Sequence, residues 1–138
     1  MIMALTEEEM KERFTKFQTI QQQMEKLSEH AQLLNQHNEE LQITTNAVTE
    51  LGKTAVNTEI LTPLADGIFL KANLLENQKL VVNVGSNTTV ERTISEVLDL
   101  LGKQKEDLAL RIIEAESVLQ ELNAQGLKIY QEVERERG

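Results

Sequence analysis

The sequence predicts an α+β fold in which two long helices form an antiparallel coiled-coil hairpin and a short β segment joins them. Three observations support this: an apolar residue every seven positions near each end of the chain, similar lengths of the two repeats, and a β-like stretch between them. A seven-residue repeat keeps one apolar seam facing a partner helix. The first repeat is Ile20, Leu27, Leu34, Leu41 and Val48, and the second is Ile94, Leu101, Leu108, Ala115, Leu122 and Ile129.

The first helix is expected over residues 6–52. Thr6 and Glu9 form a capping box, in which side chains satisfy backbone N–H groups at the start of a helix. The acidic run after Thr6 also suits the positive end of the helix dipole, and Gly52 suits a C-terminal cap. At a rise of about 1.5 Å per residue, this helix is expected to be about 70 Å long.

The second helix is expected over residues 93–136, where Thr93 and Glu96 repeat the capping box. Helices of nearly equal length that are joined at one end can pair along their whole extent. Aligning them from the joined ends places Ile20 near Gly126. The seam also has three polar members, which are expected to fix its register at some cost in stability. These polar members are Asn38, Thr45 and Lys105.

The middle segment, residues 58–92, predicts two β-hairpins. Asp66-Gly67 lies between apolar runs and suits a tight turn with positive φ, and Gly85-Ser86-Asn87 marks a second turn. Pro63 belongs on a strand edge, because proline cannot donate a ladder hydrogen bond. Four short strands cannot build a stable core of their own. We therefore expect the segment to assemble with copies or relatives of itself.

The composition limits the classes of function. The chain has 138 residues, which suits one domain, no cysteine, and a net charge of −9. An acidic balance is poorly suited to nucleic acid or anionic lipid, which need clustered lysine and arginine. The apolar start, Met1 to Leu5, is too short for a signal peptide or a membrane span. A soluble, cytoplasmic protein is expected.

No catalytic or metal-binding constellation is evident in the sequence. His30 and His37 are seven residues apart, about 10 Å along a helix, which is too far to hold one metal ion. They flank the seam at positions that usually face solvent. The six glycines are scattered and form no phosphate-binding loop, and Ser86 lies in a turn without a nucleophile motif. We expect no enzymatic activity, no cofactor and no metal.

Apolar residues are in surplus at the free ends of the two helices, which coincide in an antiparallel pair. Such surfaces mark interaction sites, and methionine adapts to varied partners. Fraying or contact with a neighbouring chain is the alternative. The residues concerned are Met1, Ile2, Met3, Leu5, Met10 and Phe14 at the free end of the first helix, and Leu127, Ile129, Tyr130 and Val133 at the free end of the second.

The middle segment and its flanks resemble the prefoldin family, and more closely its α class. The residues that show the resemblance are Thr58–Leu64, Gly67–Ala72, Val81–Ser86 and Val90–Thr93. The resemblance extends over nearly the whole chain but is weak in the helices, where any coiled coil looks similar. Two hairpins are expected of the α class, and one of the β class.

The resemblance implies a single prefoldin-type domain over residues 1–138 and a hexamer of two α and four β subunits. Its β-hairpins would form an oligomeric β-barrel platform, from which the coiled coils extend. The tips would hold unfolded client proteins without ATP and deliver them to a group II chaperonin. Assembly would use Ile60, Leu61, Ile68, Leu70, Val82 and Val84. Candidates for client contact are Met3, Leu5, Met10, Phe14, Phe17, Leu127, Ile129, Tyr130 and Val133, of which Phe17 and Ile129 are also candidate seam residues.

Two other interpretations stay open at this point. The chain suits a structural scaffold that positions other proteins and binds no unfolded client. It also suits a prefoldin-like subunit in a different assembly, such as a filament or a nuclear cochaperone complex.

Overall fold

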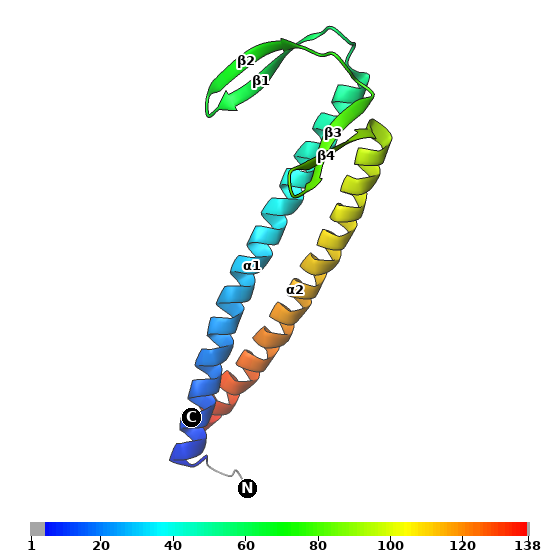
Figure 1. Ribbon diagram of the computed structural model, residues 1–138. Coiled ribbons are helices and arrows are strands. Elements are labelled where there is room, and N and C mark those ends of the chain that lie inside the picture. The colour runs from blue at the N-terminus through cyan, green and yellow to red at the C-terminus, as the bar shows by residue number, and fades with distance from the viewer. Residues whose placement is uncertain (1–4, 138) are drawn as a thin grey trace. The chain divides into compact units, whose positions relative to one another are not determined.

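The computed structural model describes residues 5–137 and has two long helices and two antiparallel β-hairpins (Figure 1). This confirms the predicted fold class. Each helix begins and ends one residue later than expected. The elements are α1 (Glu7–Lys53), β1 (Glu59–Ala65), β2 (Ile68–Asn73), β3 (Lys79–Gly85), β4 (Thr88–Thr93) and α2 (Ile94–Arg137).

Both helices begin at the predicted threonine caps. The Glu9 N–H donates to Thr6 Oγ1 at 3.2 Å, and the Glu96 N–H donates to Thr93 Oγ1 at 3.1 Å. A capping residue satisfies a free N–H but is not itself helical. This is why the helices start at Glu7 and Ile94 rather than at the threonines.

Backbone contacts divide the chain into two compact units, which we describe separately. The helical unit comprises residues 1–37 and 108–138, and the hairpin unit comprises residues 38–107. In the helical unit, the start of α1 lies antiparallel to the end of α2 (Figure 1). Its buried apolar residues belong to the two heptad repeats, except Ala31, which lies three positions before Leu34 and so faces the same seam. They are Ile20, Ala31, Leu34, Leu108, Ala115 and Ile129. The expected neighbourhood of Ile20 and Gly126 is confirmed, because a Cβ on Gly126 would lie 3.5 Å from Ile20 Cγ2.

The expected role of Gly52 was wrong. Gly52 lies inside α1, which extends to Lys53, and its φ is not positive. A Cβ at this position would lie 3.2 Å from Ile94 Cγ2, which is a tight contact. The glycine therefore permits a close approach between the end of α1 and the start of α2, rather than capping the helix.

Two polar seam residues satisfy their hydrogen-bonding groups locally. The Thr45 hydroxyl donates to the Leu41 carbonyl at 2.7 Å, one turn earlier in α1. Lys105 donates to the side-chain oxygen of Gln42 across the helix pair. Among the described side chains, no buried polar atom lacks a partner. The polar residues of the seam therefore leave no buried side-chain N or O atom without a hydrogen-bond partner.

Each hairpin is a separate two-stranded sheet. The β1–β2 turn has Gly67 at φ 77°, and the β3–β4 turn has Ser86 and Asn87 at φ 50° and 60°. Two successive positive φ values are typical of the type I′ turn, which matches the natural twist of a hairpin. Both predicted turns are thus confirmed. Each hairpin also has an irregularity before its turn, at Leu64 and at Val84.

The connector between the hairpins, residues 74–78, makes hydrogen bonds just after the end of α1 and at the start of α2. Leu74 is buried, and its backbone exchanges hydrogen bonds with Asn57 and Thr58 at 2.7 and 3.0 Å. The Asn77 side chain donates to the Thr54 carbonyl at 2.8 Å, and the Ile94 N–H donates to the Gln78 carbonyl at 3.0 Å. These contacts fix where each hairpin begins.

Candidate functional site

The helical unit exposes large apolar side chains where α1 begins and α2 ends. Phe14, Leu127 and Tyr130 are 59%, 54% and 53% exposed. The remaining described candidates are half-buried, except Ile129, which is 7% exposed and lies in the seam. Met3 lies outside the described residues. The half-buried candidates are Leu5, Met10, Phe17 and Val133.

Leu5 and Met10 also have a local structural role. Thr6 is the N-cap of α1, so Leu5 directly precedes the cap and Met10 is the fourth residue of the helix. Apolar residues at these two positions usually pack together as a hydrophobic staple, which sets the direction in which the chain enters the helix. The half-buried state of both side chains is consistent with this arrangement.

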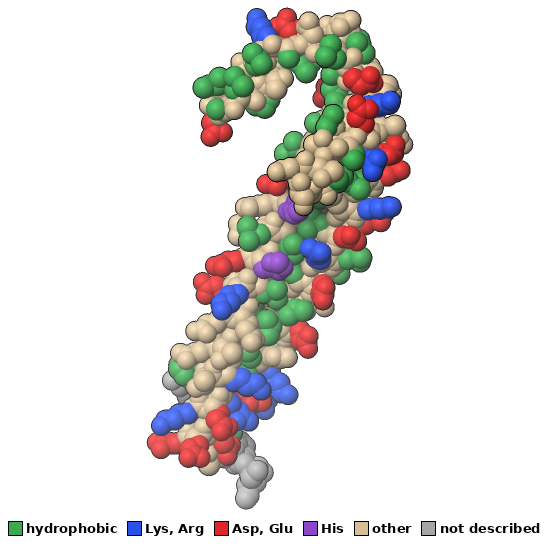
Figure 2. Space-filling model, in the orientation of Figure 1, with side chains coloured by type: hydrophobic (Ala, Val, Ile, Leu, Met, Phe, Trp, Pro, Cys, Tyr) green, Lys and Arg blue, Asp and Glu red, His purple; other side chains and the backbone are tan. Residues whose placement is uncertain are grey.

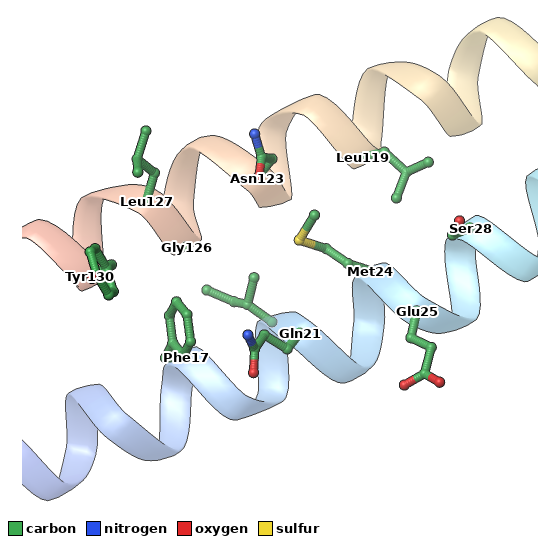
Figure 3. Close-up of a pocket in the computed structure, with 11 residues that line it drawn as sticks. Phe17, Gln21, Met24, Glu25, Ser28, Leu119, Asn123, Gly126, Leu127 and Tyr130 are labelled. Carbon is green, nitrogen blue, oxygen red and sulfur yellow. The ribbon is translucent and has the colours of Figure 1, made fainter.

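An apolar groove runs along one side of the seam in the helical unit. Its volume is about 670 Å³. In Figure 3, Met24 and Leu119 point into the space between the helices, and the rings of Phe17 and Tyr130 lie near Gly126. Its lining residues are Phe17, Ile20, Gln21, Met24, Glu25, Ser28, Leu119, Asn123, Gly126, Leu127 and Tyr130.

A second hollow lies nearer the start of α1, with a volume of about 380 Å³. Phe14 of this hollow and Gln21 of the groove both occupy the position that directly follows the seam in the heptad, one repeat apart. They therefore flank the same side of the seam. The second hollow is lined by Met10, Lys11, Phe14, Thr15 and Val133. Together the two hollows give this side of the helical unit an apolar face, which we call the groove side.

Near the start of α1 and the end of α2, the opposite side of the seam is charged. The Arg13 Nε–H donates to Glu132 Oε2 at 2.6 Å, which joins α1 to α2. The hollow there has a volume of about 470 Å³ and is lined by Glu12, Arg13, Lys16, Gln125, Lys128, Ile129 and Glu132. Figure 2 shows acidic and basic side chains next to one another over this part of the helices. We call this the charged side.

The ion pair shifts the pKa of both partners. The hydrogen bond from Arg13, and then the positive charge of Arg13, lower the pKa of the Glu132 carboxyl. The same hydrogen bond raises the pKa of Arg13, so the guanidinium keeps its charge. Both side chains are about one-third exposed, at 32% and 35%, so solvent screens the pair.

We predict that Glu132→Gln lowers the Tm slightly at neutral pH and leaves it unchanged in strong acid. A carboxyl whose pKa is lowered by folding stabilises the folded chain above its unfolded-state pKa of about 4.3. That stabilisation is lost as the pH falls through the lower folded-state pKa. Thermal unfolding followed by circular dichroism from pH 7 to about pH 2 measures the difference. Glu134→Gln is the control, and an equal effect from both variants would exclude a specific role for the pair.

The β1–β2 hairpin has exposed apolar side chains on both faces. Thr62 pairs with Leu70 and Ile60 with Ala72, which places Ile60, Ile68 and Leu70 on one face. Leu61 and Phe69 lie on the other, opposite Lys71 and Pro63. Ile68, Phe69, Leu70 and Leu61 are 57%, 58%, 52% and 63% exposed. Two exposed apolar faces favour association, because each removes apolar area from water when it is covered.

The β3–β4 hairpin is less apolar. Leu80, Val82 and Val90 share one face and are half-buried. The other face has Asn83, Thr89 and Glu91 beside the exposed Val81. Val84 lies at the irregularity before the turn and is 57% exposed. Only one face of this hairpin is therefore suited to apolar association.

Other candidate chemistry is sparse in the described part of the chain. His30 and His37 are both exposed (Figure 2), as their heptad positions suggested. Across residues 5–137, no three His, Asp or Glu side chains are grouped so that they could hold a metal ion. Within the same range, neither helix has a stretch long and apolar enough to cross a membrane.

Sequence reasoning found the apolar ends of the helices but not the groove. Gln21, Ser28 and Asn123 line it and were not among the candidates. The heptad spacing could have identified them, because each occupies the heptad position directly after the seam, on the same side as Phe14 and Tyr130. Leu74 of the hairpin unit was also missed, because the adjacent Leu75 is equally apolar in sequence but is 82% exposed.

Comparison with known proteins agrees with the resemblance to prefoldin. A family model described as "Prefoldin subunit" matches residues 20–137. A Pyrococcus horikoshii protein named "Prefoldin subunit alpha" is 31% identical over 121 residues, which cover 87% of this chain and 82% of that protein. An Archaeoglobus fulgidus protein of the same name is 23% identical over 128 residues, 93% of both chains.

A solved structure with the same fold is a filamentous PFD from Methanocaldococcus jannaschii, determined by cryo-EM. The TM-score is 0.75 at 19% identity, and the match covers 86% of this chain and 98% of that one. At this level of identity the similarity concerns the fold alone.

Proposed function

This chain belongs to the prefoldin family of chaperone subunits, with α subunits among its relatives, and we propose that it is an ATP-independent holding chaperone. In this proposal the exposed apolar residues of the helical unit bind unfolded polypeptides, and the assembly delivers them to a group II chaperonin. The whole chain acts as a single prefoldin-type domain. No catalytic step and no cofactor are part of the proposal.

The groove side of the helical unit is the observation that supports client binding most strongly. It combines exposed aromatic and aliphatic side chains in a chain whose net charge is −9. Unfolded polypeptides differ from folded ones by exposing apolar side chains, which associate with such a surface without sequence specificity. The acidic surface elsewhere disfavours aggregation of the chaperone itself.

Weak binding at each subunit suits a holding chaperone. One groove of this size buries too little apolar area for tight binding. Several subunits around one client raise the effective concentration, so that the assembly holds the client although each contact is weak. Release then requires only that the contacts open one after another.

For assembly, we propose that the apolar faces of the hairpins join this chain to β-class subunits in an α2β4 hexamer with a β-barrel platform. The assembly residues are Ile60, Leu61, Ile68, Leu70, Val82 and Val84. The exposed apolar faces of β1–β2 support this role. We place the complex in the cytoplasm, with which a sequence free of cysteine is compatible.

A filament is the second candidate assembly, because the solved structure with the same fold is that of a filamentous PFD. Native mass spectrometry of the complex purified from its source distinguishes the two. A hexamer gives one mass with a fixed subunit ratio, whereas a filament gives a ladder of masses.

Aggregation of a test client examines the proposed function directly. Citrate synthase is heated with the chain and a β-class prefoldin subunit from the same source, without nucleotide, and light scattering is followed. The expected result is suppression of scattering at near-equimolar assembly. If the chain is a scaffold that binds no client, scattering will equal that of citrate synthase with an inert protein.

A further inference from the structure

Gly126 lies in the interior of α2, where glycine is unfavourable relative to alanine. The packing of the seam does not require it. A Cβ at this position would lie 3.5 Å from Ile20 Cγ2 and 3.9 Å from Phe17 Cε2, which are ordinary van der Waals distances. At Gly52, by contrast, a Cβ would lie 3.2 Å from Ile94 Cγ2. The absence of a side chain at position 126 therefore needs another explanation.

The missing side chain leaves a notch in the groove. Gly126 is buried, and near it the rings of Phe17 and Tyr130 have centroids 6.4 Å apart and are tilted by 37°. Figure 3 shows these two rings near Gly126, with Leu127 pointing away from α1. Gly126 lines the groove, so any side chain larger than a hydrogen atom at this position would occupy part of that space, next to Ile20 and Phe17.

The lining of the groove suits an extended polypeptide segment. Gln21, Ser28 and Asn123 offer uncharged donors and acceptors beside the apolar side chains. An unfolded segment presents both apolar side chains and unpaired backbone N–H and C=O groups, which such a lining can satisfy together. The one charged lining residue, Glu25, points away from α2 in Figure 3.

We propose that Gly126 forms the floor of a notch that receives one aliphatic side chain of an extended, unfolded client segment lying along the groove side. This inference rests on the proposed holding function and adds the position and direction of the bound segment. From Phe17 to Ser28 the helical rise gives about 17 Å, which an extended strand of about five residues spans.

A second copy of this chain fits the groove less well. The groove has a volume of about 670 Å³, which is in the range of sites that hold small ligands. The net charge of −9 on each copy also opposes their association. The ion pair between Arg13 and Glu132 lies on the charged side and not among the residues that line the groove.

The substitution Gly126→Ala separates helix stability from client binding. The added methyl group is expected to raise the Tm by about 4 °C through helix propensity, and to weaken binding of the client about tenfold by filling the notch. Gly102→Ala is the matched control, because it lies in the same helix with no atom within 4 Å of its Cβ position. Gly102→Ala should raise the Tm similarly and leave binding unchanged.

The measurement is fluorescence anisotropy of labelled, reduced and carboxymethylated α-lactalbumin, which stays unfolded, with the full-length chain in its assembly. Equal binding by Gly126→Ala and the wild type would overturn the notch and leave the holding function intact. A wild-type assembly that does not bind the probe would overturn both.

Photo-crosslinking tests the same inference without altering Gly126. A benzoylphenylalanine at position 123 lies on the groove side, and one at position 125 lies on the charged side, only two residues away. Crosslinks to the unfolded probe are expected from position 123 and not from 125. Equal crosslinking from both positions, or crosslinking from 125 alone, would overturn the inference.

Discussion

Replacing both Ile68 and Leu70 by aspartate is expected to dissociate the assembly and leave the helices folded. Both side chains are more than half exposed on one face of β2, so the substitutions remove little from the core of the subunit. In an apolar interface, however, two uncompensated carboxylates would be removed from water. The cost is about 4 kcal/mol or more, which weakens association at least roughly a thousandfold.

Analytical ultracentrifugation with β-class partner subunits measures this effect, and circular dichroism reports the helix content. The control is Ser86→Asp with Thr89→Asp, which adds the same two charges to the turn and polar face of the β3–β4 hairpin. The control should assemble as the wild type does. An Ile68→Asp/Leu70→Asp variant that still assembles would show that this face of β1–β2 is not part of the interface.

The second large effect is expected from removing the apolar end of the helical unit. Trimming residues 1–13 and 126–138 should preserve assembly, because all four strands lie within residues 59–93, and should abolish the suppression of client aggregation. Full suppression by the trimmed assembly would contradict the assignment of client binding to the helix ends.

Because trimming also removes seam residues, a substituted variant of full length gives the sharper comparison. Phe14, Leu127 and Tyr130 are exposed, so replacing all three by glutamine should affect stability little. Client binding should fall at least about tenfold, since each lost apolar contact contributes about 1 kcal/mol or more and the losses multiply across subunits.

The matched control replaces three other exposed apolar residues of the helical unit, Leu33, Leu110 and Ile113, which are 63%, 66% and 63% exposed. These residues lie outside the groove and the second hollow. If the control weakens binding equally, clients bind any exposed apolar residue of the helices, and the groove side has no special role.

The helices and both hairpins could be predicted from the sequence because their signals are local. The heptad spacing fixes which residues face the seam, and Ile20, Leu34 and Leu108 are buried as the repeat requires. The threonine caps and the positive φ at Gly67, Ser86 and Asn87 depend on a few neighbouring residues.

The missed features depend on contacts between distant segments. Gly52 suits a helix end by residue type, but it lies inside the helix. Its role there depends on Ile94, about 40 positions away, which packs closely against it. Leu74 and Leu75 are equivalent in sequence, and only hydrogen bonds to Asn57 and Thr58 determine which one is buried. The groove likewise requires the register of α1 against α2, which places Gly126 opposite Phe17 and Ile20.

Hydrogen–deuterium exchange of the assembled chain, with and without bound carboxymethylated α-lactalbumin, tests the central claim most directly. The claim is that unfolded clients bind along the helical unit and that the hairpins serve assembly. Amides near the ends of helices open readily, so a bound segment slows their exchange measurably. We predict client-dependent protection in residues 10–28 and 119–133, which line the groove side, and none in residues 59–93. Protection confined to the hairpins while the client remains bound would contradict the account.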